Sequence, residues 1–532
     1  SAASDVYKRQ LICIGVEVVL EIMVPKLMAD LIDIGVTNSD VPYIINKGIQ
    51  MAVCAVAALI LGVGSARFSA LAGQGLGANI RKAEYEKLQS YSFSNIDHFS
   101  VSSLVTRLTS DVTNIQNAVS TGMRPFGRSP VMLIFATTLA FQINSTLALV
   151  FLVALPVLAV LLIIIIINVG PRYGRMQGAV DLVNRCIEEN LTAVRVVKSY
   201  VRGDYEIEKF GHVNDNLKNE SEKAFGIAVL NMPAMQFVMY STILGILLIG
   251  GRLINSGQMM IGQLTSFLSY VLLILNSLMM MSNVFLLMTR SLASAERIMK
   301  VIDEPIDITD ENARNIEVKK GEIEFNHVWF KYNETAKEYV LSDVSFHINA
   351  GQTVGIIGQT GSSKTTLIQL IPRLYDASNG EIKIDGINVK EYPVRHLRDA
   401  ISVVLQKNTL FSGSLIDNLR WGNENATLDE IKEACSIACV DEFIDRLSGG
   451  LDAEMGQEGV NVSGGQKQRI CIARAILKKP KVLILDDSTS AVDTATEGKI
   501  RNALAKKLPD MTKIIIAQRI SSVCHACLLY TS

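Results

Sequence analysis

The chain lacks an excess of charge of either sign, and it contains few aromatic residues and few cysteines. Its 532 residues include 51 Lys and Arg against 52 Asp and Glu, so no overall positive field favours nucleic acid as a partner. The eight cysteines show no spacing typical of a disulfide framework. Cys435 and Cys439 have no matching Cys or His pair nearby, so we expect them to pack in a core rather than bind zinc. No cleavable signal peptide is recognisable.

Hydrophobic residues, in contrast, are abundant. They make up 49% of the chain, charged residues make up 19%, and the mean hydropathy is +0.29. This composition is more apolar than that of a soluble enzyme and more charged than that of a pure membrane bundle. Because one domain usually holds roughly 100–200 residues, we expect about three parts, some in a membrane and some in water.

The two ends of the chain are related at the level of DNA. "DVYKRQ" at residues 5–10 and "CLLYTS" at residues 527–532 can be encoded by one short element read in opposite orientations. Chance is the alternative explanation. We expect residues 1–10 and 527–532 to be translated remnants of a sequencing adapter, with the true protein continuing beyond each. Native codons in the source contig would contradict this.

Six long apolar stretches occupy the first half of the chain. Each is near the ~20 residues that cross a bilayer as a helix. They lie at about 11–34, 47–73, 128–145, 147–170, 226–252 and 261–287. The first is the least apolar, because Glu17, Glu21, Lys26 and Asp30 interrupt it. The pattern predicts an all-α transmembrane domain of six helices over residues 11–290.

The loops between these stretches predict the orientation. The 30–45 loop has three aspartates and no Lys or Arg, whereas the connections 74–127 and 171–225 are rich in both. Basic loops favour the cytoplasmic side, so we expect both long connections and both chain ends inside the cell, with the protein in the cytoplasmic membrane. Helical patterns in these connections predict that the helices continue well past the membrane.

After residue 290 the hydrophobicity falls. An acidic linker over 291–320 is followed by β-rich runs that alternate with helical segments, such as "GEIEFNHVWFKY", "TVGIIG", "ISVVLQ", "KVLILDD" and "KIIIAQ". This alternation predicts an α/β domain over 321–526 with a mostly parallel sheet.

One stretch of this second domain has the spacing of a P-loop. "GIIGQTGSSKTTLIQLI" follows a β-rich run and opens a helix, the context in which backbone N–H groups cradle phosphate. We expect Lys364 to reach the β and γ phosphates and Thr365 to bind Mg²⁺. Ser363 stands where glycine is usual, and a plain glycine-rich turn is the alternative. The predicted phosphate-binding residues are Gly358, Gln359, Thr360, Gly361, Ser362, Ser363, Lys364, Thr365 and Thr366.

Two carboxylates end the apolar run "LILDD". Asp486 is placed as the Mg²⁺-side acid, and Asp487 as the acid that orients or deprotonates the attacking water. A helix cap or a surface pair is the structural alternative. Upstream, "NVSGGQKQRICIARAIL" puts Ser463, Gly464, Gly465 and Gln466 at a helix start, a second anion-binding arrangement. A second such site makes sense if it serves the nucleotide held by a partner.

These motifs together resemble those of a half-transporter of the ATP-binding cassette (ABC) exporter family, over about residues 11–526. The resemblance rests on the P-loop, "VVLQKNTLF", "VSGGQ", "LILDD" and "SAVD" in family order. It implies that Tyr332 stacks on adenine and that Gln406 senses Mg²⁺ and the γ-phosphate. It also implies that "AEMGQEG" (453–459) touches coupling helices near "NIDHFSVSSLVTRL" and "ENLTAVRVVKSY". Ordinary surface helices are the alternative for those two segments.

The chain departs from the family at two positions of one ATP site. Members competent in hydrolysis carry glutamate and histidine where this chain has Asp487 and Gln518. A carboxylate shorter by one methylene is withdrawn by about 1 Å, which can cost on the order of 100-fold in rate. Gln518 cannot carry a proton. The resemblance therefore implies that this chain is the weakly hydrolysing subunit of a heterodimer, rather than one half of a homodimer. The partner half-transporter would carry the glutamate and the histidine.

The substrate is left open by the sequence. We expect ATP-driven export of a small amphipathic or drug-like compound from the cytoplasmic membrane, with ATP and Mg²⁺ as cofactors and lipid as surroundings. Glu17 and Glu21 lie one helical turn apart and would suit a cationic compound, or helix packing equally well. Lipid or peptide export and an ATP-gated regulatory membrane protein are the rival functions. A soluble nucleotide-binding module is disfavoured by the apolar stretches.

Overall fold

The chain forms two compact units, which are described separately. The computed structural model describes residues 2–311, 313–359, 361–487, 492–517 and 528–531. The first unit comprises Ser1–Glu86 and Val105–Ile302, and the second comprises Lys87–Leu104 and Asp303–Ser532. Segment 87–104 thus belongs to the second unit, although it precedes most of the first unit in the sequence.

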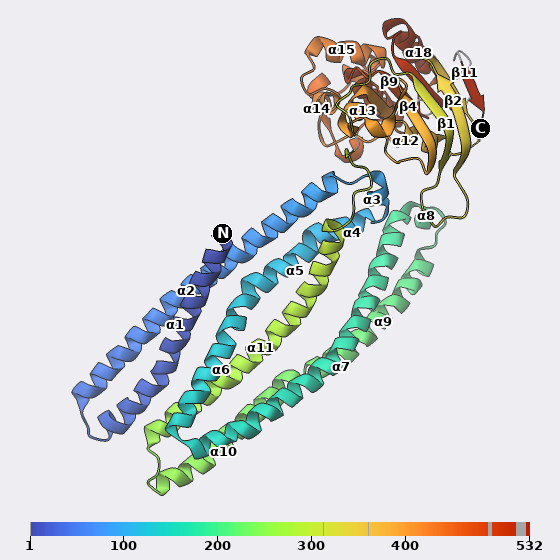
Figure 1. Ribbon diagram of the computed structural model, residues 1–532. Helices are drawn as coiled ribbons and strands as arrows, with labels where there is room; N and C mark the ends of the chain where they lie inside the picture. The colour runs from blue at the N-terminus through green and yellow to red at the C-terminus, as the bar shows by residue number, and fades with distance from the viewer. Residues whose placement is uncertain (1, 312, 360, 488–491, 518–527, 532) are drawn as a thin grey trace. The chain divides into compact units, whose positions relative to one another are not determined.

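Long helices build the first unit (Figure 1). The long helices are α1 (Ala2–Asp30), α2 (Val41–Gln89), α6 (Met123–Ile143), α7 (Ser145–Thr192), α9 (Gly203–Ala228), α10 (Asn231–Asn255) and α11 (Ile261–Ile302). Between them lie the short helices α5 (Val112–Asn117) and α8 (Val194–Ser199) and the π-helical turns η1 (Leu31–Val36), η2 (Arg107–Asp111) and η3 (Ala118–Gly122). The short helix α4 (Val101–Thr106) begins in the second unit and ends in the first. The α2, α7 and α11 helices have 49, 48 and 42 residues. At 1.5 Å per residue each is roughly 60–75 Å long, about twice the hydrocarbon core of a bilayer. Their length confirms that helices continue past a membrane.

Four helical stretches among the described residues are long and apolar enough to cross a membrane. They are Val41–Gln89, Val101–Ile143, Gly203–Asn255 and Ile261–Met281. A shorter apolar helix, Ser145–Leu161, lies within the expected 147–170 span. Charged residues inside the expected 11–34 span, among them Glu17, Glu21 and Lys26, are the physical reason that this span is not among the four. The spans over 11–34 and 147–170 therefore stay predictions, as does the count of six.

The core of the first unit lies between α1, α6, α7, α10 and α11. Polar anchors fix α11 to α1 inside it. Tyr270 Oη donates to the Ile22 carbonyl oxygen at 2.9 Å, and Ser266 Oγ donates to that of Pro25 at 2.9 Å. At the helix start, Asp33 accepts the Gly262 backbone N–H at 2.6 Å. These bonds satisfy backbone groups that lipid could not.

Small residues let α2 approach η3 closely. Ser69 Oγ donates to the Ser120 carbonyl oxygen at 2.8 Å. A Cβ on Gly73 would lie 2.7 Å from Ser120 Cβ and 2.9 Å from the Gln116 carbonyl oxygen. Close backbone contact through small residues is a main source of helix packing in membranes.

The described residues of the second unit form three sheets. An antiparallel sheet has the order β2-β1-β4-β5, a parallel sheet has the order β11-β3-β10-β9-β6, and β7 pairs with β8. The strands are β1 (Ile323–Phe330), β2 (Leu341–Ile348), β3 (Thr353–Ile357), β4 (Asn379–Ile384), β5 (Ile387–Asn388), β6 (Ile401–Val404), β7 (Gly413–Ser414), β8 (Glu454–Met455), β9 (Val482–Asp486), β10 (Thr512–Ala517) and β11 (Leu528–Thr531). The helices are α3 (Phe93–Asp97), α12 (Lys364–Leu370), α13 (Val394–Ala400), α14 (Leu415–Arg420), α15 (Leu428–Ile437), α16 (Asp441–Ile444), α17 (Gly464–Leu477) and α18 (Thr494–Lys507), with short 3-10 turns η4 (Val389–Glu391), η5 (Gly450–Asp452) and η6 (Gln457–Gly459).

The "GEIEFNHVWFKY" run does not join the parallel sheet that the alternation of strands and helices predicted. That strand, β1, pairs antiparallel with β2 and β4. Its residues alternate in burial, whereas every residue of β9 is buried. A strand with one partly exposed face suits an antiparallel sheet, and a strand buried on both faces suits a parallel one. The other four runs lie in β3, β6, β9 and β10, as predicted.

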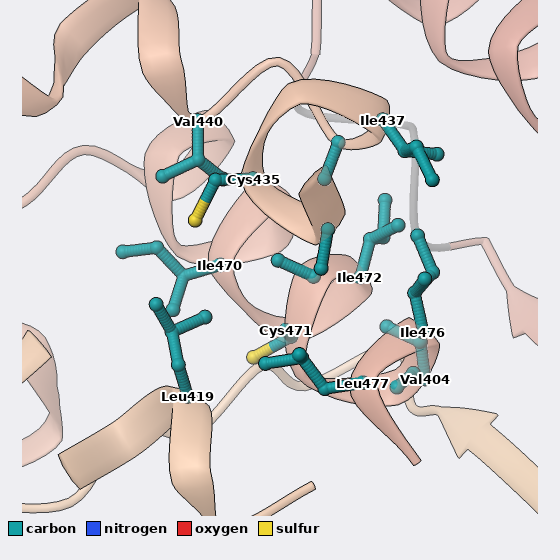
Figure 2. Packing of buried hydrophobic residues seen from close by; sticks show 14 of the residues in the cluster. Val404, Leu419, Cys435, Ile437, Val440, Ile470, Cys471, Ile472, Ile476 and Leu477 are labelled. Carbon is teal, nitrogen blue, oxygen red and sulfur yellow. The ribbon is translucent and has the colours of Figure 1, made fainter. Parts of the chain in front are cut away.

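The parallel sheet separates two hydrophobic cores. Leu483 and Leu485 of β9 belong to a core with α14, α15 and α17, while Val482 and Ile484 belong to a core with α12 and the antiparallel sheet. Figure 2 shows the first of these cores, in which the Cys435 and Cys471 side chains lie among aliphatic residues. Burial raises the pKa of the Cys435 thiol to about 12, as packing in an apolar core requires.

We expect Gly73→Ala to destabilise the first unit, because its new Cβ would overlap η3. Overpacking of this kind typically costs about 1–3 kcal/mol. Gly75→Ala on the same helix is the matched control, since a Cβ there meets nothing within 4 Å. Thermal unfolding of the full chain in detergent, followed through the reactivity of buried cysteines, measures both. Equal unfolding temperatures for the two variants would refute close packing of α2 on η3.

Candidate functional site

The carboxyl ends of four parallel strands meet at one edge of the sheet in the second unit. In register, Ile357 of β3 pairs with Ala517 of β10, and Ile516 of β10 pairs with Asp486 of β9. Val404 of β6 pairs with Leu485 of β9. The P-loop follows β3, Asp486 ends β9, and Gln406 follows β6 by two residues. Ligands of parallel α/β sheets bind at this edge.

The side chain of Lys364 folds back onto the P-loop. Its Nζ donates to the carbonyl oxygens of Gly358 at 2.8 Å and Gln359 at 2.6 Å, and lies 3.1 Å from Ser362 Oγ. The ammonium group therefore sits over the loop, where a phosphate group would compete for it. Thr360 lies outside the described residues.

Ser363 adopts a backbone conformation that favours glycine. It is the N-cap of α12 with φ 61 and ψ 18, in the left-handed region. A non-glycine residue there costs roughly 1–2 kcal/mol. Gly361, with φ +88, has open space around the position of a Cβ. The departure seen in the sequence is thus a site of backbone strain.

Thr365 and Asp486 are in direct contact. Thr365 Oγ1 donates to Asp486 Oδ2 at 2.9 Å. Burial raises the pKa of Asp486 and the neighbouring Asp487 adds to the rise, while the Thr365 hydrogen bond and the Lys364 charge oppose it. A hydroxyl and a carboxylate side by side are the hard oxygen ligands that Mg²⁺ prefers.

The backbone of Asp487 is hydrogen-bonded to the neighbouring strand. It has φ 45, and its N–H donates to the Ile516 carbonyl oxygen at 3.1 Å. The backbone position that follows β9 is therefore fixed to β10. Gln518, the second departure from the family pattern, lies outside the described residues.

Tyr332 lies beside the helix that follows the P-loop. Its hydroxyl is 2.9 Å from Thr366 Oγ1 and donates to Gln369 Oε1 at 3.4 Å. The side chain is 48% exposed, so one face of the ring is accessible to a planar base. Sequence reasoning missed Tyr375, whose ring contacts the Tyr332 ring edge-to-face at 5.2 Å. Its place in the irregular stretch after α12 gives no periodic signal.

Within "VSGGQ", Val462 is buried in the core, whereas Ser463 and Gly464 are exposed at the start of α17. Ser463 is the N-cap, its Oγ accepts the Gln466 N–H at 3.4 Å, and its N–H donates to Gln466 Oε1 at 2.8 Å. This capping box fixes the turn that carries Gly464 and Gly465. Gln406 is also exposed. Both groups therefore face away from the core of their own unit.

The first unit holds a separate cavity of about 770 Å³. Arg124 Nη2 donates to Glu17 Oε1 at 2.7 Å, and Arg128 pairs with Glu21. The four charges thus balance. The cavity is lined by these four residues and by Val24, Pro25, Ala55, Ala58, Leu59, Gly62, Val63, Ala66, Ser269, Leu272, Leu273 and Asn276. Sequence reasoning placed Arg124 in a basic loop and did not find these pairs, because the partners are 107 residues apart.

A helical unit with apolar spans and a P-loop unit define an ATP-binding membrane protein. Residues 10–278 match the family described as ABC transporter transmembrane region, and residues 341–490 match that described as ABC transporter. The ABC transporter ATP-binding protein YfiB of Bacillus subtilis is 37% identical over 516 residues, which cover 97% of this chain and 89% of YfiB. The chain belongs to the ABC transporter family.

Two further matches extend this likeness. The ATP-dependent lipid A-core flippase of Desulfotalea psychrophila is 31% identical over 459 residues, covering 85% of this chain and 79% of the flippase. The structure of a bacterial Atm1-family ABC exporter with ATP bound has a TM-score of 0.85 at 20% identity, over 98% of this chain and 93% of that one. The chain is thus a multi-pass protein of the cell membrane that couples an ATPase to transport.

We expect Ser363→Gly to raise ATP affinity about 5-fold, or about 1 kcal/mol, because it removes both the strained backbone and the Cβ beside the phosphates. Ser363→Ala is the matched control, since it keeps the Cβ and loses only the hydroxyl. Titration of full-length protein with a fluorescent ATP analogue measures both. An equal gain in both variants would assign the effect to the hydroxyl instead.

We expect Asp486→Asn to stabilise the nucleotide-free protein and to weaken Mg²⁺-dependent ATP binding. Because the folded-state pKa of Asp486 is raised, ionising this group costs stability, and wild type loses stability as the pH rises through that pKa. The difference in unfolding temperature between variant and wild type should therefore grow with pH above the usual aspartate range near ~4. Loss of a metal-side group typically costs 10–100-fold in affinity. A pH-independent difference would contradict the buried carboxyl.

Proposed function

We propose that this chain is the weakly hydrolysing subunit of a heterodimeric exporter of small amphipathic or drug-like compounds. The observation that carries the proposal is Asp487, an acid one methylene short at the position that should orient the attacking water. Its backbone N–H is bonded to the Ile516 carbonyl oxygen of β10, and moving the residue to offset the shorter side chain would cost this bond.

Nucleotide binding follows from the groups at the sheet edge. Lys364 would exchange its loop carbonyls for the β and γ phosphates, and the P-loop N–H groups would complete the cradle. Thr365 and Asp486 would hold Mg²⁺ between them, with Gln406 as a third oxygen donor. Mg²⁺ would neutralise charge on the phosphates during transfer.

The exposed signature supports a two-chain ATP site. Ser463 closes a capping box through its acceptor oxygen, so its hydroxyl hydrogen is free to turn toward an anion from another chain. The Gly464 and Gly465 N–H groups lie at the start of a 14-residue helix, where the dipole also favours an anion. The signature keeps its Ser-Gly-Gly-Gln and departs from the family only at Val462, where leucine is usual, while the catalytic pair is weakened. This chain would therefore complete the partner's site better than its own.

The cavity of the first unit guides the choice of substrate. Its wall is mostly apolar, and its two acids are each paired with an arginine. A charge-balanced wall of this kind suits an amphipathic or zwitterionic compound better than a simple cation. The flippase relative keeps lipid export as the second candidate, because its name states a lipid substrate. Peptide export and ATP gating of a regulatory membrane protein have no observation of their own.

Transport would follow from ATP holding two nucleotide-binding units together and hydrolysis letting them part. A space between the membrane domains of the two subunits would then open alternately to the two sides of the membrane. ATP retained at the weak site would keep the two units partly engaged between cycles. The exposed α8 tip, with Tyr200 75% and Val201 88% exposed, is the segment that we expect to meet the partner.

We expect Asp487→Glu with Gln518→His to raise hydrolysis at this site about 10- to 100-fold, since the carboxylate regains about 1 Å of reach and the imidazole can carry a proton. Single-turnover hydrolysis and substrate uptake into vesicles should be measured with the partner half-transporter present. Asp487→Asn, which keeps the length and removes the base, is the control and should stay slow. Brisk substrate-stimulated turnover by paired copies of the unaltered chain alone would overturn the heterodimer.

A further inference from the structure

Segment 87–104 packs against residues 304–305 of the second unit. Asn95 Nδ2 donates to the Pro305 carbonyl oxygen at 2.8 Å, and His98 Nδ1 lies 2.8 Å from Glu304 Oε1. Asn95 is only 2% exposed. The short helix α3 is therefore held on the second unit by side chains at its middle and its end.

Tyr375 makes the remaining contacts with α3. Its Oη donates to Asp97 Oδ2 at 2.6 Å, and its ring meets the Phe93 ring edge-on at 6.1 Å. Burial and the Asp97 carboxylate raise the pKa of Tyr375, so the hydroxyl keeps its proton and remains a donor at physiological pH. This is a charge-assisted bond, which is short and directional.

The opposite side of Tyr375 touches the predicted adenine-binding residue. The Tyr375 and Tyr332 rings are 5.2 Å apart at 87°, and the Tyr332 hydroxyl is 2.9 Å from Thr366 Oγ1 in the first turn of α12. Three contacts in series thus run from the helix after the P-loop, through Tyr332 and Tyr375, to Asp97. Edge-to-face ring pairs depend on orientation, so a turn of one ring changes its contact with the next.

The backbone that carries Tyr375 is clamped on both sides. Arg373 is 5% exposed and pairs with Asp376 through Nε at 2.9 Å. Arg398 Nη2 donates to the Arg373 carbonyl oxygen at 2.7 Å. Movement of the Tyr332 ring is therefore passed to the Tyr375 side chain rather than absorbed by its backbone.

We propose that Tyr375 is a positioning residue that couples adenine binding at Tyr332 to the docking of α3. The inference rests on the proposed function, in which the ATP base stacks on Tyr332. A stacked base fixes the Tyr332 ring, the fixed ring sets the Tyr375 ring, and the Tyr375 hydroxyl holds Asp97. Because coupling is reciprocal, docked α3 strengthens ATP binding by the same factor. A triphosphate without the base would occupy the P-loop but would not contact Tyr332, so it would not affect the contacts from Tyr332 through Tyr375 to Asp97.

Hydrogen exchange of the full-length transporter, with its partner half-transporter and Mg²⁺, tests the base dependence. ATP should slow exchange in peptides of segment 87–104 at least about 5-fold more than inorganic tripolyphosphate does, the lower range of typical coupling. Tyr375→Phe keeps the ring and removes the bond to Asp97, so the advantage of ATP over tripolyphosphate should vanish in this segment. Asp97→Asn should give the same loss from the other side of the bond.

Tyr339→Phe is the matched control, because it removes a hydroxyl of the same unit whose ring packs on Trp329 instead. It should behave as wild type. Peptides covering the P-loop report nucleotide binding itself and should be protected in every variant. Equal protection of segment 87–104 by ATP and tripolyphosphate in wild type, or full ATP protection in Tyr375→Phe, would overturn the coupling. Absence of P-loop protection by either ligand would overturn the nucleotide site, and the coupling with it.

Discussion

The parallel register of β3, β10 and β9 is the constraint on which the nucleotide site depends. Each of these strands is buried, so its hydrophobic pattern fixes where it ends as well as where it pairs. Asp486 is the last residue of β9 and lies opposite Ile516, which brings its carboxylate within 2.9 Å of Thr365. The N–H of the next residue, Asp487, donates to the Ile516 carbonyl oxygen at 3.1 Å. In the function that we propose, the reach of this residue toward a phosphate would depend on its side chain, which is one methylene shorter than that of glutamate.

A different constraint acts in the first unit, where lipid offers no hydrogen bonds. Charges in an apolar helix persist only when they are paired or face water. Glu17 and Glu21 satisfy the first condition, since each pairs with an arginine of α6, and both line the cavity. Close approach of α2 to η3 at Gly73 brings the helix backbones into contact. The cavity thus remains open between helices whose positions are fixed by polar and steric contacts at its rim.

Local pattern in the sequence was sufficient for much of this structure. The P-loop spacing, the all-apolar run before Asp486 and the capping box at Ser463 are each contained in fewer than twenty consecutive residues, and each forms the expected element. Contacts between residues far apart in the sequence could not be predicted. The run that forms β1 was recognisable as β-rich, yet its antiparallel partners β2 and β4 could not be predicted from it. The Tyr375–Asp97 bond joins residues 278 positions apart, and no periodicity in either segment predicts the other.

The asymmetry that we propose for this chain rests on how its two anion-binding elements are built. The P-loop carries strain at Ser363 and holds its lysine on its own carbonyl oxygens, so phosphate must displace existing bonds. The signature turn is already ordered by Ser463 and Gln466 at the exposed start of α17, so an anion brought by another chain meets a preformed site. In the heterodimer that we propose, a subunit with this combination would bind its own nucleotide at some cost in displaced contacts and would complete a neighbour's site at little cost. That proposal accounts for both elements with the same physical argument.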